Sequence, residues 1–332
     1  MSFPFDSAPA AFAAAAVREA AQLVRRVQAE MVTDAISKED KSPVTVADFA
    51  AQALVAYRLR EWDSSAALVG EESAVALREP AARGTLEQIT QFVASVVPEA
   101  TSDAVCEWID RGDADPPAEF WTLDPVDGTK GFLRGDQYAV AFALIRDGVV
   151  QVGALGCPEL EGASSPAKGG AGTVIVAVRG EGAFAQPLDD PNAEWKRLHV
   201  ADVADPANAR MLRSVEKAHT DTGGIGELVA SLGVTADPVP LDSQAKYSVL
   251  AAGGGDVLLR LLSPSRPDYR EKIWDQAAGS IVVEEAGGRV SDLDGKPLDF
   301  SHGRTLATNR GVLATNGKLH DAFLAGLKAI GA

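Results

Sequence analysis

The sequence predicts an α+β protein of two lobes, with an antiparallel sheet in the N-terminal lobe and an α/β arrangement in the C-terminal lobe. Three observations lead to this prediction. Hairpin signals recur between residues 138 and 184, short strands alternate with helices after residue 210, and 332 residues suffice for two domains. A polar, proline-bearing stretch at residues 187–195 separates the two patterns. We therefore expect the N-terminal lobe to span residues 1–195 and the C-terminal lobe residues 196–332.

The N-terminal half begins with two predicted helices and two predicted strands. Apolar residues recur at helical spacing over residues 12–33, and after a polar stretch a second helix is expected to open at Asp48. Short apolar runs at 66–69 and 120–123 predict strands. The first run stops at Gly-Glu-Glu (70–72) and the second at Asp-Pro-Val-Asp-Gly-Thr (124–129), so both predicted strands end in carboxylates.

The remaining elements follow from alternation and turn residues. Apolar residues alternate over 138–144 and again over 150–154, and Asp147-Gly148 between them predicts a tight hairpin. A further strand pair is expected near 174–176 and 182–184. Downstream we expect strands at 210–214 and 255–259 and helices at 224–232, 245–252 and 275–286, the last of which is capped by Gly287-Gly288.

Composition excludes several classes of function. Lys and Arg total 31 against 47 Asp and Glu, a net charge of −16, so a general attraction to nucleic acid is not expected. No apolar run reaches the length that a bilayer requires, and the alanine-rich N-terminal segment lacks the basic residues of a targeting signal. The two cysteines are far apart and fit a reducing compartment. We expect a monomeric cytoplasmic protein that binds neither membrane nor nucleic acid.

The acidic strand ends offer the ligands of a hard cation. Asp124 and Asp127 flank Pro125, which stiffens the segment, and the carbonyl of Val126 lies between them. Mg²⁺ prefers such carboxylate and carbonyl oxygens, and Glu71 and Asp275 could complete the shell. Taken singly, each acid has an ordinary alternative, because Asp48 and Asp275 could be helix caps and Glu71 could be a solvated loop residue.

The combination of motifs is more specific than any one of them. With Gly-Glu-Glu upstream and Trp-Asp-Gln-Ala-Ala-Gly (274–279) downstream of the Asp-Pro-Val-Asp-Gly-Thr segment, the sequence resembles the lithium-sensitive, Mg²⁺-dependent phosphatases of the inositol monophosphatase superfamily. The segments at 41–48, 214–219, 241–247 and 271–275 look like its 3′(2′),5′-bisphosphate nucleotidase branch, although Ala218 stands where that branch often has glycine.

The resemblance implies a fold, an activity and a set of site residues. The implied fold is a layered αβαβα sandwich, and the implied cofactor is Mg²⁺, two or three ions in each active site. The ligands would be Glu71, Asp124, the Val126 carbonyl, Asp127 and Asp275, with Asp48 and Thr129 orienting the attacking water. The implied reaction removes the 3′-phosphate of adenosine 3′,5′-bisphosphate (PAP), and cleavage of its phosphosulfate analogue PAPS stays open.

A substrate with two phosphates also needs basic contacts away from the metals. Gly128 and Thr129 could supply backbone N–H donors to one phosphate. The candidates for the other are His219, Ser243, Lys246, Arg260 and Arg270. Each could equally be an ordinary solvated surface residue.

Two rival functions remain at this stage. An inositol monophosphatase or inositol polyphosphate 1-phosphatase would share every metal ligand, and only the segment 242–246 distinguishes it. A non-catalytic sensor of bisphosphorylated nucleotides belongs to a different class. The presence of Asp48 and Thr129 argues against a sensor, since pure binding needs no water-activating pair.

Overall fold

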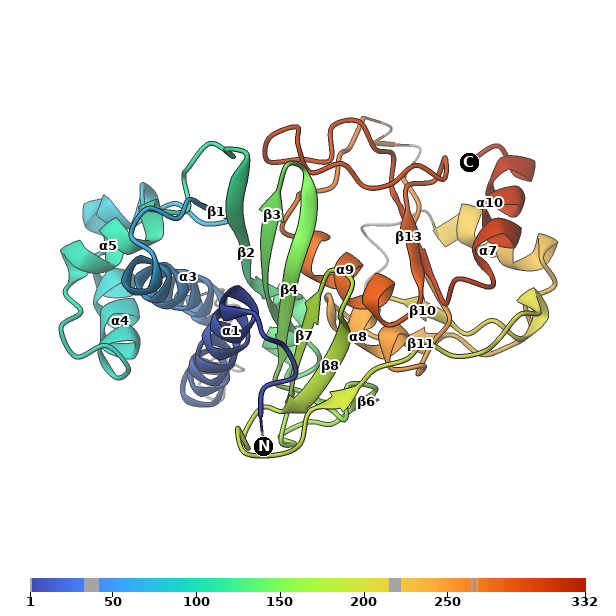
Figure 1. Cartoon of the computed structure of the whole chain (residues 1–332). Helices are drawn as coiled ribbons and strands as arrows, with labels where there is room; N and C mark the ends of the chain where they lie inside the picture. The colour runs from blue at the N-terminus through green and yellow to red at the C-terminus, as the bar shows by residue number, and fades with distance from the viewer. Residues whose placement is uncertain (1, 33–41, 215–221, 264, 267) are drawn as a thin grey trace.

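The computed structural model describes residues 2–32, 42–214, 222–263, 265–266 and 268–332, and these form five layers in the order α, β, α, β, α (Figure 1). Helices α1 (Ala8–Val27) and α3 (Ser42–Trp62) cover one face of a seven-stranded sheet. The middle layer contains α8 (Ala245–Ala251) and α9 (Ala277–Glu285), and a five-stranded sheet follows. The outer layer contains α7 (Thr222–Ser231) and α10 (His320–Ala329). The layered sandwich expected from the sequence is confirmed.

The large sheet is antiparallel except at one edge, where β1 runs parallel to β2. Its strands, in spatial order, are β1 (Leu68–Gly70), β2 (Glu119–Asp127), β3 (Ala139–Arg146), β4 (Val149–Cys157), β7 (Thr173–Val178), β8 (Gly182–Pro187) and β9 (Lys196–Arg197). Asp147 and Gly148 join β3 to β4 with φ angles of 50° and 74°. Positive φ at both positions is the requirement of a type I′ turn, so the hairpin prediction is confirmed.

The small sheet combines parallel and antiparallel pairs. Strand β10 lies between β11 and β12 and is parallel to both, whereas β14 is antiparallel to β12 and β13. Its strands, in spatial order, are β11 (Val239–Pro240), β10 (Met211–Arg213), β12 (Val257–Arg260), β14 (Val312–Thr315) and β13 (Arg289–Ser291). A separate two-stranded ribbon pairs β5 (Leu160–Glu161) with β6 (Ser165–Pro166).

Two predicted helices begin earlier than the sequence suggested. Helix α1 begins at Ala8, where the Oγ of Ser7 accepts a hydrogen bond from the backbone N–H of Ala10, and a π-helical turn (Gln28–Val32) continues it. Helix α3 begins at Ser42, so the prediction that Asp48 opens this helix is wrong. Proline is tolerated in a first helical turn, and Pro43 therefore did not mark a break. Asp48 lies inside α3 with its side chain buried.

The other helices lie around these layers. Helices α4 (Arg83–Ala94) and α5 (Ser102–Asp110) pack on the outer side of α3, and the short α6 (Thr129–Arg134) follows β2. Three 3-10 turns complete the described elements, at Ala76–Arg78, Pro80–Ala82 and Pro206–Asn208.

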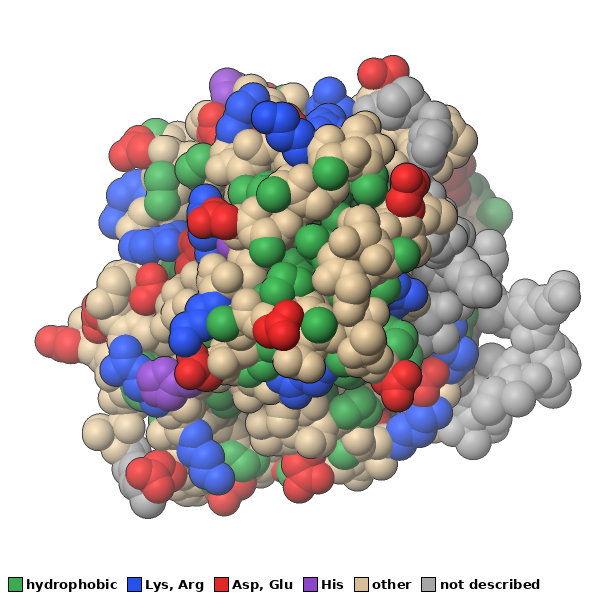
Figure 2. Space-filling model, turned by 90° about the vertical axis from the view of Figure 1, so that its right-hand side faces the viewer, with side chains coloured by type: hydrophobic (Ala, Val, Ile, Leu, Met, Phe, Trp, Pro, Cys, Tyr) green, Lys and Arg blue, Asp and Glu red, His purple; other side chains and the backbone are tan. Residues whose placement is uncertain are grey.

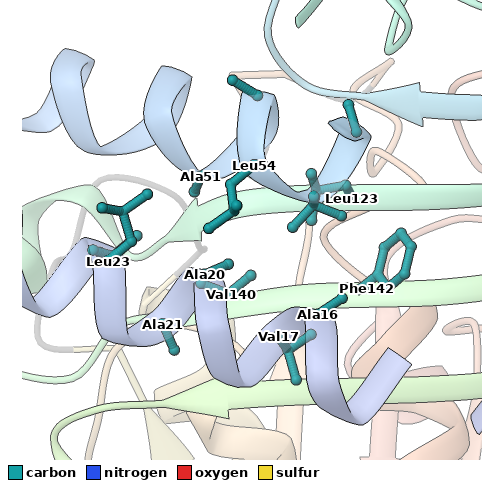
Figure 3. Packing of buried hydrophobic residues seen from close by; sticks show 14 of the residues in the cluster. Ala16, Val17, Ala20, Ala21, Leu23, Ala51, Leu54, Leu123, Val140 and Phe142 are labelled. Carbon is teal, nitrogen blue, oxygen red and sulfur yellow. The ribbon is translucent and has the colours of Figure 1, made fainter. Parts of the chain in front are cut away.

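Alanine side chains let α1 approach the sheet and α3 closely. Figure 3 shows Ala16 and Ala20 of α1 packed near Leu54 of α3 and Phe142 of β3. The short side chains leave little space between the backbones, and burial of the apolar surface stabilises this layer.

Two glycines let helices press on both faces of β4. A Cβ added at Gly156 would lie 2.7 Å from the carbonyl oxygen of Val17 in α1. A Cβ added at Gly153 would lie 2.4 Å from the Cγ2 atom of Ile281 in α9. The two glycines are three residues apart and therefore point to opposite faces of the strand. Strand β4 is thus packed between α1 and α9.

On the face shown in Figure 2, which contains the end of the molecule near α7 and α10, acidic and basic side chains are intermixed around a hydrophobic area. Within the described ranges, none of the helices has both the length and the apolarity needed to cross a membrane.

Candidate active site

The acidic strand ends meet because β1 and β2 are parallel neighbours. Gly70 pairs with Leu123 in the register of the two strands, so Glu71 and Asp124 follow at the same edge of the sheet. The charge of Glu71 acts on Asp124, which is consistent with their closeness at this edge. Asp48 of α3 reaches the same place from the helical layer, where burial, and then the charges of Glu72 and Glu71, raise its pKa well above the ordinary value. Three separate elements thus supply one acidic cluster.

Strand β2 continues through the acidic motif, which we expected to be a loop. The register slips between Asp124, which pairs with Ala141, and Asp127, which pairs with Ala139. Pro125 has no N–H to contribute to a ladder, and such residues are found at bulges and edges. The bulge keeps both aspartates at the carboxyl end of β2. Asp124 is buried, and Asp127 is half-buried.

Burial and mutual repulsion raise the pKa values of the carboxyl groups in this cluster. Burial, and then the charges of Glu71 and Asp127, raise the pKa of Asp124 well above its ordinary value. Burial and Asp127 raise the pKa of Asp275 in the same way. Although part of the Glu71 side chain reaches solvent, enclosure of its carboxyl group by protein, together with Glu72 and Asp127, raises its pKa to about 7. The cluster therefore concentrates negative charge that only cations or protons can balance.

The donor set suits a hard divalent cation. It consists of carboxylate oxygens with the buried Val126 carbonyl between them, and Asp124 Oδ1 is buried and accepts no hydrogen bond from the described residues. A buried acceptor of this kind needs a partner, and Mg²⁺ would provide one. No three of the described His, Cys, Asp and Glu side chains already stand in the arrangement of a finished metal shell.

Gln52 fixes the turn that carries Glu71 and Glu72, a role that our sequence analysis missed. Its side chain lies in α3, one turn after Asp48, and is completely buried. Its Nε2 donates to the carbonyl oxygens of Glu72 (2.6 Å) and Ile109 (2.9 Å), and its Oε1 accepts from the N–H of Glu72 (3.0 Å). The position of Gln52 four residues after Asp48, on the same helix face, was the available signal.

A cavity of about 570 Å³ adjoins the acidic cluster and is also lined by cationic side chains. Asp127 and Asp275 form its acidic side, and Lys246 and Arg260 form its cationic side. Lys246 Nζ donates to the Oγ of Ser214 at 2.8 Å. Burial, and then the charge of Arg260, lower the pKa of Lys246 to about 8. Two cations that converge in one cavity favour an anionic ligand.

The two sides of the cavity touch at Gly128 and Ser243. Gly128 has a φ of 93°, and a Cβ added there would lie 2.7 Å from the Cβ of Ser243. Ser243 itself has a φ of 64°, a conformation that non-glycine residues adopt rarely. An ion pair between Arg134 of α6 and Asp242 ties the same two segments together. The segment after β2 and the segment before α8 therefore keep a fixed separation.

The structure brings together most of the residues predicted for the site. Those that line the cavity are Asp127, Gly128, Thr129, Ser243, Lys246, Arg260 and Asp275. Asp48, Glu71, Asp124 and Val126 belong to the adjoining acidic cluster or to the strand that carries it.

One predicted phosphate contact lies outside the cavity, and another falls in a part of the chain that the structure does not describe. Arg270 does not line the cavity, and its guanidinium donates to the backbone carbonyl of Tyr269 at 2.9 Å. His219 lies outside the described residues.

A model of the inositol monophosphatase family matches residues 7–331 of this sequence. The chain belongs to the inositol monophosphatase family. Among curated relatives, a protein of Oryza sativa named 3′(2′),5′-bisphosphate nucleotidase is 42% identical, and the match covers 96% of this chain and 93% of the relative. Proteins of the same name from Emericella nidulans and Schizosaccharomyces pombe are 40% and 41% identical, over 95% and 91% of this chain and 96% and 90% of their own lengths.

Solved structures of the inositol monophosphatase family share the fold. SuhB of Mycobacterium tuberculosis superposes with a TM-score of 0.63 at 23% identity, over 97% of this chain and 96% of that one. An inositol monophosphatase from Anabaena superposes with the same TM-score at 18% identity, over 96% and 95% of the two chains. At these identities the similarity shows the fold alone. Enzymes of this family are Mg²⁺-dependent in general, in agreement with the oxygen donors of the acidic cluster.

Proposed function

We propose that this chain is a Mg²⁺-dependent 3′(2′),5′-bisphosphate nucleotidase that hydrolyses the 3′-phosphate of PAP and releases AMP and phosphate. One observation carries the proposal. A single cavity is lined both by members of the carboxylate cluster and by two cations, the buried Lys246 and the half-buried Arg260. A substrate with two phosphates matches both sides. The printed names of the relatives that are about 40% identical over nearly the whole chain support the same conclusion.

In this proposal Glu71, Asp124, the Val126 carbonyl, Asp127 and Asp275 hold two or three Mg²⁺ ions around the phosphate that is removed. Bound Mg²⁺ would supply an activated water and neutralise charge on the transferring phosphoryl group. Asp48 and Thr129 orient the attacking water, and the Asp48 carboxylate accepts its proton.

Lys246 and Arg260 hold the phosphate that is kept, with Ser243 on the turn beside them. The hydrogen bond from the backbone N–H of Gln244 to Asp127 Oδ2, at 2.6 Å, joins this turn to the acidic side. Because the separation of the two sides is fixed, binding of the second phosphate aligns the first for attack.

The inositol phosphatases remain the alternative within the same chemistry. They would share the acidic side of the cavity, but an inositol monophosphate offers no second phosphate to Lys246 and Arg260. Only the bisphosphate offers these cations a charge-assisted hydrogen bond to a second phosphate, so the cationic side favours it.

Phosphate release from PAP, inositol 1-phosphate and fructose 1,6-bisphosphate tests the assignment in one panel. We expect PAP to have the highest kcat/KM, and EDTA to abolish its hydrolysis. A higher kcat/KM for inositol 1-phosphate than for PAP would refute the nucleotidase assignment. PAPS, added as a fourth substrate, would show whether the phosphosulfate is also cleaved.

We infer further that the chain acts as a monomer in the cytoplasm. The expected exclusion of nucleic acid rests on the net charge of −16. Size-exclusion chromatography with light scattering tests the oligomeric state, and a dimer mass would refute that part.

A further inference from the structure

Glu271 binds the guanidinium of Arg260 and, unlike Arg260, does not line the cavity. Its carboxylate accepts two hydrogen bonds from the guanidinium, from Nη2 at 2.8 Å and from Nε at 3.3 Å. The Glu271 side chain is only 3% exposed, while that of Arg260 is 24% exposed and lines the cavity. The guanidinium is therefore the solvent-facing member of this pair.

A hydrogen-bonded chain buttresses Glu271. Gln276 Nε2 donates to Glu271 Oε2 at 2.9 Å, and the hydroxyl of Tyr247 donates to Gln276 Oε1. Tyr247 and Gln276 are both buried, and they come from α8 and from the N-terminal end of α9. Two segments thus support one carboxylate, which limits the orientations open to Arg260.

Without Glu271, other charges would compete for the guanidinium. Asp275 lies near enough to interact with Arg260 electrostatically, and Arg260 in turn acts on Asp127. Both acids belong to the proposed metal shell. A guanidinium that turned toward them would leave the second phosphate and compete with cations for the same oxygens.

We propose that Glu271 is a positioning residue that holds the guanidinium of Arg260 on the cavity wall, directed at the second phosphate of the substrate and away from Asp127 and Asp275. This inference rests on the proposed nucleotidase function. An arginine has five N–H groups, and Glu271 engages one on Nε and one on Nη2. No other hydrogen bond of the Arg260 side chain joins it to a described residue, so the rest remain for phosphate oxygens.

The test compares equilibrium binding of AMP with that of adenosine, by calorimetry, in Mg²⁺ and again in EDTA. AMP carries the 5′-phosphate and adenosine does not, so the ratio of their affinities reports the second phosphate alone. We expect Glu271→Gln to weaken AMP binding about tenfold and to leave adenosine binding unchanged, because a misdirected guanidinium loses a charge-assisted contact. Glu271→Asp keeps the charge on a shorter side chain and should give an intermediate loss.

Kinetics provides a second readout that a purely structural role would not change. In Glu271→Gln the KM for PAP should rise by a larger factor than the KM for adenosine 3′-monophosphate, which has no second phosphate. Glu284→Gln is the matched control, because it removes a carboxylate from the surface pair with Arg179. This control should behave as wild type in every assay.

The results distinguish an error in the proposed function from an error in the role assigned to Glu271. If the wild type does not hydrolyse PAP, or binds AMP no better than adenosine, the proposed function itself is wrong. If the wild type behaves as expected and Glu271→Gln binds AMP with wild-type affinity, only the role of Glu271 is overturned. Parallel weakening of AMP and adenosine would also overturn it. Should Glu271→Gln not fold, Glu271→Asp decides by the same comparison.

Discussion

Replacing Gln52 by leucine should detach the turn of Glu71 and Glu72 from helix α3. Leucine has a similar volume but can make none of the three hydrogen bonds that the glutamine amide forms with Glu72 and Ile109. The perturbation therefore removes polar contacts without opening a large cavity. Gln52 contacts no part of the substrate cavity, so any effect on activity must pass through the acidic turn.

The loss of stability in Gln52→Leu depends on which backbone groups lose a hydrogen-bond partner. The carbonyl of Ile109 keeps a hydrogen bond from the N–H of Gly112 at 2.9 Å, so it stays satisfied. The N–H and carbonyl of Glu72 lose the Gln52 side chain. A buried polar group left unsatisfied costs about 1 to 3 kcal/mol, and Glu72 is half-buried, so we expect a loss of about 2 to 4 kcal/mol in the free energy of unfolding.

Urea denaturation monitored by tryptophan fluorescence measures this loss, and a Mg²⁺ titration of PAP hydrolysis measures the effect on the turn. We expect the Mg²⁺ concentration for half-maximal activity to rise several-fold, because Glu71 is no longer held beside Asp124. A Gln52→Leu protein within about 0.5 kcal/mol of the wild type, a change typical of surface positions, would refute the reasoning.

A pair of glycine substitutions tests the same contact without touching Gln52. A Cβ added at Gly112 would lie 2.5 Å from Gln52 Nε2, whereas a Cβ added at Gly84 in α4 has no heavy atom within 4 Å. Gly112→Ala should therefore displace Gln52 and reproduce the loss. Gly84→Ala should be neutral or stabilise the protein by up to about 1 kcal/mol, since alanine favours a helix.

Three further predictions concern the cavity and the core. Asp124→Asn should abolish PAP hydrolysis in a protein whose circular dichroism is unchanged, because a neutral amide cannot replace an anionic ligand; wild-type turnover in this variant would contradict the metal assignment. Lys246→Ala should lower the ratio of kcat/KM for PAP to that for adenosine 3′-monophosphate by about one to two decades, because it removes a charge-assisted contact. An unchanged ratio would show that Lys246 does not bind the second phosphate. His320 is buried between Ser291 and Thr315, and burial, and then the charge of Arg289, lower its pKa from 6.5 to about 4. As pH falls from 6.5 toward 4, His320 is protonated in the unfolded chain but stays neutral in the folded chain. The free energy of unfolding therefore decreases over that pH range. Between pH 7 and 5 the wild type should lose about 2 kcal/mol more than His320→Gln in urea denaturation, and equal losses would contradict the prediction.

Elements with a local signal could be predicted from the sequence. The β3–β4 hairpin is an example, since Asp147-Gly148 specifies a type I′ turn and the flanking alternation specifies the strands. Helices α8 and α9 follow from apolar spacing, and the N–H of Gly287 donates to the Glu284 carbonyl at 3.0 Å as expected of a glycine cap. Helices α4, α5 and α10 were not predicted, although the spacing of Phe323 and Leu327 in α10 carries the same kind of signal.

Asp48 was placed at a helix start because a polar stretch precedes it, but α3 begins at Ser42, with Pro43 in its first turn. Other features that were missed or predicted wrongly depend on partners distant in sequence. The β2 strand was ended at Leu123 because Pro125 follows, but pairing of Asp127 with Ala139 carries the strand through a bulge. Gln52 has no local signal beyond its spacing of four residues from Asp48, and Glu271 has no periodic pattern. Their roles arise from contacts with residues 20 and 11 positions away.

The fold resolves the conflict between a chain of net charge −16 and an anionic substrate by separating the two signs within one cavity. Asp127 lies at the boundary, where burial raises its pKa and the charges of Lys246 and Arg260 lower it. The Gly128–Ser243 contact allows no extra atom between the two sides. Under the proposed function, selectivity for a bisphosphate then follows from the fixed distance between the acidic cluster and the cationic side. A substrate with one phosphate engages only one of the two sides, and it forgoes the alignment that the other would provide.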